Sequence, residues 1–397
     1  MRRRSGQASG REKEIDMFGD IHPIAPNTLF IEGLDPRLIL REPDVASVIL
    51  HKAGDTLYLL DTGATRFFRE RIKQAAERLR PFARLVLLNS HGHPDHTPNN
   101  AVVREIEADH KAHFIAQAAL SNLDYAERTR RDFAGIAEYY HLEDGPGFPF
   151  SLLMKPLKLF RLVWPALIER HFLSAMIRGI MRKFEPLEPS PETATPLETL
   201  QAETIRLGGV NFNGWKFGGD VWVIETRGHT PDSVSFFLPR MKILFLADET
   251  VDYFNCWADS SAARVTAALE AALALYKAGE ISVLIGGHQT DVFRGEAISA
   301  LLRRLLGQQD AIMRALQEIL AVHPRGLTVK SIYRRLKKYR RTPATDRFFQ
   351  YEFPKMPGML KTEIVYALLE AGYKADGKHG RKRFYAQAAG QPAPPGN

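Results

Sequence analysis

The chain is poor in cysteine and has no long hydrophobic run. Cys256 is the single cysteine in 397 residues, so no internal disulfide can form and any zinc would be held by nitrogen and oxygen ligands. Residues 1–14 carry five arginines and lysines with no apolar segment after them, so we expect no secretory signal. No window of 18 uncharged apolar residues occurs, so we expect no membrane span. Together these absences predict a cytoplasmic protein.

Positive charge is concentrated near the C-terminus. Residues 323–387 contain 16 lysines and arginines and 5 aspartates and glutamates, a net charge of +11. The whole chain has a net charge of +8, so the remainder has a net charge of −3. This asymmetry predicts two parts of the chain with different partners.

Apolar runs alternate with amphipathic segments over much of the chain, which predicts an α/β fold. We expect strands over residues 46–50, 56–60, 85–89 and 111–116, and helices over 67–79 and 98–107. After residue 200 we expect strands over 203–206, 220–226, 233–237, 242–246 and 281–285, and a helix over 261–278.

The strand pattern lapses between about residues 120 and 200, where we expect a helical insertion. Residues 150–184 are apolar, basic and helical in composition. The insertion is either an extra helical pair packed on the core, or a lid or interfacial patch for a hydrophobic or anionic substrate.

A histidine cluster follows the expected strand over residues 85–89. Residues 90–96 are Ser-His-Gly-His-Pro-Asp-His, with His91, His93, Asp95 and His96 as candidate ligands. A buried cluster of imidazoles repels itself once any ring is protonated, and a metal resolves this by binding one nitrogen of each neutral ring. In an extended stretch, His91 and His93 project to the same side and can share one metal. The sequence therefore predicts a metal site.

Three further candidate ligands follow expected strands. His229 lies in Gly-His-Thr-Pro, Asp248 in Ala-Asp-Glu and His288 in Gly-Gly-His. Functional side chains at strand ends are typical of open α/β folds. The glycines before His288 would let the backbone come close to the site.

This ordered set of motifs resembles the metallo-β-lactamase-fold hydrolase superfamily over roughly residues 21–306, except the insertion. The resemblance implies a four-layer αββα sandwich with two metals at one edge between the sheets. It implies that one metal is held by His91, His93 and His229, and the second by Asp95, His96 and His288, with Asp248 bridging them. Asp61 would hydrogen-bond the ligand loops without touching metal. Ser90 stands where threonine is usual, and residues 97–100 replace a glycine-rich continuation.

The C-terminal part is predicted to be a winged helix. Helical patterns over residues 299–320, 328–339 and 359–371 precede a basic turn and a short strand over 383–386. This order resembles the winged-helix module of some superfamily members, including an RNA-cleaving branch. Such a module binds nucleic acid or packs against the hydrolase domain or a second subunit. We expect a hydrolase domain over 15–303, the winged-helix-like domain over 304–388 and a disordered tail over 389–397.

The resemblance implies a dinuclear zinc-dependent hydrolase that uses a metal-bridging hydroxide. We expect it to cleave an ester, lactone or thioester of a hydrophobic or acyl-bearing small molecule. Asp95 and Asp248 would lower the net charge of the site and orient the nucleophile. Tyr253 and Trp257, just beyond Asp248, either line the pocket or pack as ordinary loop residues. Iron or manganese is an alternative to zinc, because nitrogen and oxygen ligands accept both.

Two other functions stay open at this point. The same metals could serve a ribonuclease or phosphodiesterase, with the basic C-terminal part binding phosphates. A binding protein with a vestigial site is disfavoured, because all seven ligands are present. A homo-oligomer is compatible with either enzyme.

Overall fold

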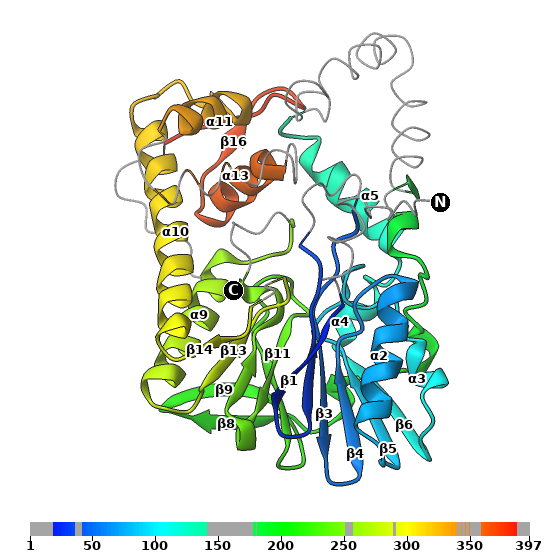
Figure 1. The fold of residues 1–397 in the computed structure, drawn as a ribbon. Coiled ribbons are helices and arrows are strands. Elements are labelled where there is room, and N and C mark those ends of the chain that lie inside the picture. The colour runs from blue at the N-terminus through cyan, green and yellow to red at the C-terminus, as the bar shows by residue number, and fades with distance from the viewer. Residues whose placement is uncertain are drawn as a thin grey trace, which may run out of the picture.

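A computed structural model describes residues 19–35, 42–140, 178–179, 181–250, 257–288, 291–339, 343, 346, 349 and 359–386. Residues 141–177 and 180 of the predicted insertion, Tyr253, Cys256 and the predicted tail lie outside these residues. The described residues form two seven-stranded mixed sheets and a small three-stranded sheet, with helices outside them (Figure 1). The predicted α/β class is confirmed.

The first sheet has the order β1-β2-β3-β4-β5-β6-β7. Its strands are β1 (Ile21–Ala25), β2 (Thr28–Ile31), β3 (Val48–Ala53), β4 (Thr56–Leu60), β5 (Arg84–Leu88), β6 (His110–Ile115) and β7 (Ala194–Pro196). Neighbours from β1 to β4 are antiparallel, and those from β4 to β7 are parallel. The parallel half needs crossover connections, which α2 (Arg66–Arg78) and α3 (Val102–Glu105) supply. β7 lies inside the segment predicted to be a helical insertion, so that prediction missed an edge strand.

The second sheet has the order β14-β13-β12-β11-β10-β9-β8. Its strands are β8 (Glu203–Leu207), β9 (Val210–Phe217), β10 (Val221–Glu225), β11 (Val234–Leu238), β12 (Ile243–Phe245), β13 (Val283–Ile285) and β14 (Phe293–Arg294). All neighbours are antiparallel except β12 and β13, which α9 (Ala262–Lys277) connects. The short elements are η2 (Arg182–Phe184), η3 (Pro191–Thr193), η4 (Leu197–Thr199), η5 (Pro239–Met241) and η6 (Ala247–Thr250).

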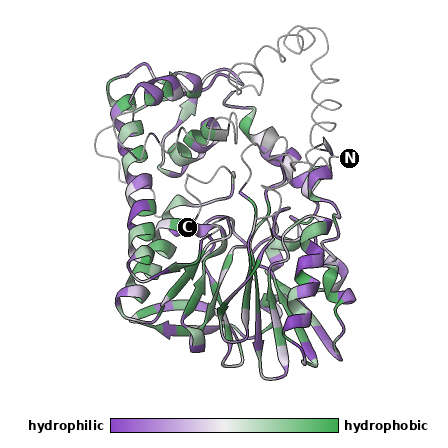
Figure 2. Cartoon of the chain, viewed as in Figure 1, coloured by the Kyte–Doolittle hydropathy of each residue, from purple (hydrophilic) through white to green (hydrophobic). Residues whose placement is uncertain are grey.

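The two large sheets pack face to face. Ile49 and Leu60 of the first sheet share a buried core with Phe236 and Phe245 of the second. A second core lies between the first sheet and α2, and a third lies between the second sheet, α9 and α10 (Glu296–Ala321). Hydrophobic residues accordingly line the strands in the middle of the molecule (Figure 2). Each fully buried large side chain contributes about 1.5–3 kcal/mol, so the layers position the strand ends firmly.

The C-terminal part continues from the long helix α10. Leu301 and Leu305 of α10 pack in the core beside the second sheet, whereas Leu316 and Leu320 pack in a separate C-terminal core. The predicted domain boundary at residue 304 thus falls inside one continuous helix. Beyond it lie β15 (Leu327–Thr328), α11 (Val329–Lys338), α13 (Met359–Glu370), β16 (Ala375–Asp376) and β17 (Arg383–Phe384). β17 pairs antiparallel with both β15 and β16.

Two helices near the start of the predicted insertion lead from the first sheet to the C-terminal part. They are α4 (Gln117–Leu120) and α5 (Tyr125–Ile136). Ile136 and Tyr140, at the end of α5 and beyond it, belong to the C-terminal core. None of the helices in the described part of the chain has the length and hydropathy that crossing a bilayer requires.

Candidate metal centre

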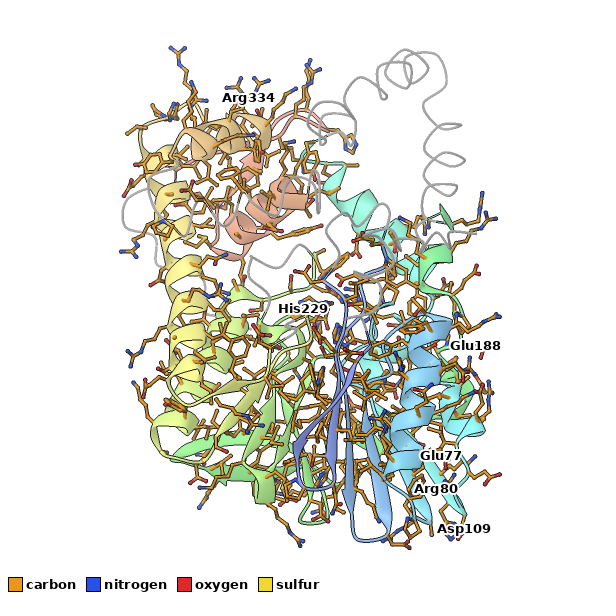
Figure 3. All side chains as sticks on the ribbon, viewed as in Figure 1. Glu77, Arg80, Asp109, Glu188, His229 and Arg334 are labelled. Atoms are coloured by element: carbon orange, nitrogen blue, oxygen red, sulfur yellow. The ribbon has the colours of Figure 1, made fainter. Side chains whose placement is uncertain are left out.

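The candidate ligands gather where strands of both sheets end. The histidine cluster follows β5, His229 follows β10, Asp248 lies in η6 just after β12, and His288 follows β13. His229 lies between the sheets and the C-terminal part (Figure 3). Two groups form, each with ligand atoms within 4.8 Å of one another. They are His91, His93, His229 and Asp248, and Asp95, His96, Asp248 and His288. The structure therefore brings all seven candidate ligands together.

Asp248 is the residue common to both groups. Its Oδ1 lies 3.1 Å from His96 Nε2, and its Oδ2 lies 3.1 Å from His288 Nε2. The same Oδ2 lies 3.4 Å from His229 Nε2 and 3.8 Å from His91 Nε2. The side chain is 3% exposed. One buried carboxylate thus reaches imidazoles of both groups.

Several ligand atoms lack hydrogen-bond partners among the described residues. They are Nε2 of His91, His93 and His96, and Oδ1 of Asp248, all of them buried. Buried polar atoms are nearly always paired, so such a cluster needs an explanation, and an ion is one. The nitrogen and oxygen donors fit zinc, and they also fit iron or manganese. The residues present therefore fit two metal ions.

The electrostatics differ between histidines of the centre. Burial and the neighbouring imidazoles hold the pKa values of His91 and His93 well below the usual range. These rings are therefore neutral, which is the form that binds metal. Burial also disfavours the charged form of His96 and His288, but Asp248 and other carboxylates outweigh it and hold both pKa values well above the usual range.

Asp61 and Ser90 orient ligands of both groups. Asp61 Oδ1 accepts a hydrogen bond from the Ser90 amide at 2.7 Å, and Oδ2 accepts one from the Ser90 hydroxyl at 2.7 Å. The same Oδ2 lies 2.9 Å from His96 Nδ1. Ser90 Oγ also lies 3.0 Å from His91 Nδ1. A serine at this position thus still supplies the hydroxyl that fixes two imidazole rings.

Sequence reasoning missed three carboxylates around the centre, two of them buried and one, Asp44, partly buried. Asp44 Oδ1 lies 3.0 Å from His288 Nδ1. Glu249 Oε1 accepts the Gly228 amide at 3.1 Å, and its Oε2 accepts the His229 amide at 3.1 Å.

The third is Asp232, whose Oδ2 accepts the Gly92 amide at 2.8 Å. Asp232 and Glu249 lie beside recognised motifs, so adjacency could have indicated them. Asp44 is far from every motif and has no local signal.

Two glycines allow close approach of the backbone to the carboxylates. A Cβ at Gly287 would lie 2.1 Å from Asp248 Oδ1, and one at Gly228 would lie 2.3 Å from Glu249 Oε2. Both distances are far below van der Waals contact, so only glycine fits without rearrangement.

The residues after the histidine cluster form a buried polar wall. Thr97 Oγ1 lies 2.7 Å from Tyr125 Oη, which connects the ligand loop to α5. Asn89 Nδ2 donates to Asn100 Oδ1 at 3.1 Å, and Asn89 Oδ1 lies 2.7 Å from His113 Nε2. These side chains support the loop from behind.

Of the two candidate pocket residues, Trp257 lies beside the metal centre, next to His93. Its ring centroid is 4.9 Å from that of His93, and the guanidinium carbon of Arg128 lies 6.0 Å from the Trp257 ring centroid. Tyr253 lies outside the described residues. An aromatic ring therefore borders the first ligand group.

A family comparison decides the assignment. The model of the metallo-beta-lactamase superfamily matches residues 41–288, more than half of the chain. The chain belongs to the metallo-beta-lactamase superfamily. With its two His/Asp groups, it is a metal-dependent hydrolase of that superfamily. No curated protein matches the chain.

Solved structures of the superfamily share the fold. A metallo-beta-lactamase family protein of Thermus thermophilus is 16% identical, with a TM-score of 0.52, and the match covers 92% of this chain and 100% of that one. A beta-lactamase domain protein of Burkholderia ambifaria is 14% identical, with a TM-score of 0.53, covering 93% and 94%. The inverting sec-alkylsulfatase Pisa1 of a Pseudomonas species is 16% identical, with a TM-score of 0.50, covering 88% and 50%. At these identities, the likeness establishes the fold alone.

Proposed function

We propose that the protein is a dinuclear zinc hydrolase that cleaves an ester, lactone or thioester. The observation that carries this proposal is Asp248, which reaches imidazoles of both ligand groups. When bound, two zinc ions supply a water of lowered pKa and positive charge for the oxygen that becomes negative. Asp95 and Asp248 lower the net charge of the centre. Trp257, beside His93, offers an apolar face to an acyl group.

The charges around the centre support a carbonyl substrate over a polyanion. Carboxylates dominate the surroundings, with Asp44, Asp61, Asp232 and Glu249 all near the ligands. The cation Arg128 beside Trp257 already pairs with Asp132 at 3.2 Å and Asp259 at 2.9 Å. Two bound zinc ions would add +4 to the −6 that Asp44, Asp61, Asp95, Asp232, Asp248 and Glu249 carry when ionised. A nucleic-acid backbone would therefore still add negative charge to a negative centre, whereas an uncharged ester or thioester would not.

The second candidate, a ribonuclease or phosphodiesterase, is favoured by the basic C-terminal part. We propose that this part is a winged helix, because α10, β15, α11, α13, β16 and β17 follow one another in the order of that module. Its α13 is largely buried, so nucleic acid would have to bind elsewhere. Exposed basic residues lie on α11, including Arg334 (Figure 3), and on the turn between β16 and β17, including Arg381.

A substrate panel with metal analysis tests the proposal. The purified zinc-loaded protein is assayed with p-nitrophenyl esters, lactones and acyl thioesters of several chain lengths, beside labelled RNA at low salt. We expect turnover of at least one carbonyl substrate, and its loss in His93→Ala but not in His110→Ala, which changes an exposed histidine outside the centre. Turnover of RNA alone would favour the second candidate. Absence of stoichiometric metal would contradict both.

A further inference from the structure

The end of α13 contacts the start of α9. Glu370, the last residue of α13, accepts hydrogen bonds from Ser261 Oγ at 2.6 Å, from the Ala262 amide at 2.7 Å and from the Ala263 amide at 3.2 Å. These amides belong to the first turn of α9. The backbone N–H groups of a first helical turn have no acceptor within their own helix. A carboxylate there also faces the positive end of the helix dipole. The N-cap residue of α9 is Ser261, whose hydroxyl accepts the Arg264 amide at 3.2 Å, and the C-terminal part adds a carboxylate cap beside it.

The start of α9 in turn holds the loop that carries His229. The Ser261 amide donates to the Gly228 carbonyl at 2.8 Å, while Glu249 accepts the Gly228 amide on the other side. A Cβ at Gly228 would lie 2.7 Å from the Val265 amide nitrogen of α9. The peptide before His229 is therefore packed directly against the first turn that Glu370 caps.

The same segment carries the aromatic neighbour of His93. Trp257 precedes Ser261 by four residues, and its carbonyl accepts a hydrogen bond from Ser260 Oγ at 2.6 Å. Asp259, between them, pairs with Arg128 of α5 at 2.9 Å. A shift of this segment would therefore move groups beside two ligands of the first group.

The contact between the two parts extends beyond Glu370. Tyr140 Oη lies 2.5 Å from Thr362 Oγ1 of α13, and Lys382 donates to Glu138 at 2.5 Å. Leu368 of α13 shares a core with Ile136 of α5. Apolar packing and polar contacts thus hold α13 and the β16–β17 turn against α5 and the residues just after it, which supports α13 and its terminal Glu370 in position.

We propose that Glu370 is a positioning residue for the metal centre, and that the C-terminal part completes the first ligand group through it. Glu370 acts on His229 through Ser261 and Gly228 and touches no ligand itself. This inference rests on the metal binding in the proposed function but not on the choice of substrate. It gives α13 an internal role, in place of the groove-reading role of the second helix in a helix-turn-helix pair.

Zinc affinity of three full-length variants tests the inference. Glu370→Ala removes the carboxylate cap and leaves the N-cap Ser261 in place, and Glu370→Gln keeps one acceptor oxygen but loses the charge. Asp376→Ala is the matched control, because this exposed carboxylate of the same part accepts a bond from its own neighbour Gly377. Metal-free protein is titrated with zinc against a chromophoric chelator, and thermal unfolding is followed in parallel.

We expect Glu370→Ala to bind one of its two zinc ions about tenfold more weakly than the wild type. Glu370→Gln should lie between the two, and Asp376→Ala should match the wild type. Equal zinc affinities in the wild type and both Glu370 variants, with only a lowered melting temperature in the variants, would make the residue a structural cap and overturn the inference alone. A wild type that binds no zinc would overturn the proposed function as well. If Glu370→Ala does not fold, Glu370→Gln decides between these outcomes.

Discussion

The two ligand groups share Asp248 but differ in burial and in donor atoms. The first adds three imidazoles, and the side chain of His91 is fully buried. The second adds the carboxylate of Asp95, and its Asp95 and His288 side chains are 12% and 16% exposed. A closed, nitrogen-rich site suits zinc, whereas an open site with more oxygen admits a wider range of metals. We therefore expect a metal bound at the second group to be the more readily exchanged.

The groups also differ in the residues that orient their histidines. His96 and His288 of the second group each lie beside a carboxylate outside the ligand set, Asp61 and Asp44. Such partners fix the ring and strengthen the ligand. In the first group, His91 lies beside the neutral Ser90 instead. Carboxylates thus face the rings of His96 and His288 in the less buried group, whereas a neutral hydroxyl faces the ring of His91 in the more buried group.

Replacing Asp248, the ligand common to both groups, should weaken metal binding at both groups alike. Asp248→Ala removes a carboxylate that reaches both, so we expect both metals to be lost or strongly weakened. Metal catalysis contributes several kcal/mol, so the rate should fall by at least about 10³-fold. Metal analysis and steady-state kinetics measure both effects. Full occupancy by two metals in this variant would refute the shared role.

His113, a buried histidine outside both groups, shows what burial does to a histidine pKa when carboxylates do not offset it. Burial lowers the pKa of His113 to about 4, since no nearby carboxylate is strong enough to compensate. The unfolded state binds the proton near the usual value of about 6.5, so stability is complete above that pH and falls as the pH drops toward 4.

For the metal-free protein, we expect the free energy of unfolding to fall by about 2 kcal/mol from pH 7 to pH 5 because of His113 alone. His113→Gln should flatten this part of the pH dependence in chemical denaturation, relative to the wild type. His110→Gln, an exposed neighbour on the same strand, serves as the control. An identical pH slope in wild type and His113→Gln would show that His113 does not titrate differently on folding.

Removing the Ser90 hydroxyl should affect the groups unequally. Its Oγ contacts His91 of the first group, whereas in the second it contacts both His96 and the Asp61 carboxylate that orients that ring. Ser90→Ala should weaken metal binding about 10- to 100-fold, with the larger loss at the second group. Ser90→Thr keeps the hydroxyl and should retain wild-type affinity. Zinc titration monitors both variants, and equal losses at the two groups would argue against the proposed asymmetry.

Strands β4, β5 and β6 of the parallel half and the ligand positions could be predicted from local sequence. The expected strand over residues 56–60 coincides with β4, because an uninterrupted apolar run bounded by turn residues is a clear signal. The histidine cluster stands out for the same local reason.

What sequence reasoning missed depends on neighbouring strands or on long-range contacts. β9 alternates apolar and polar residues, but glycines on both sides suggested turns instead. β7 has three residues and ends at Pro196, too short for a periodic signal. Asp44 reaches His288 from a distant part of the chain, and Glu370 reaches Ser261 in the same way. No local pattern encodes such contacts.

Counting zinc per chain in three zinc-loaded proteins tests the account most directly. After removal of free metal, we expect two zinc ions in the wild type and one each in His93→Ala and His288→Ala, because each variant removes a ligand of one group only. Fewer than two ions in the wild type, or an unchanged count in both variants, would contradict a centre built from two groups around Asp248.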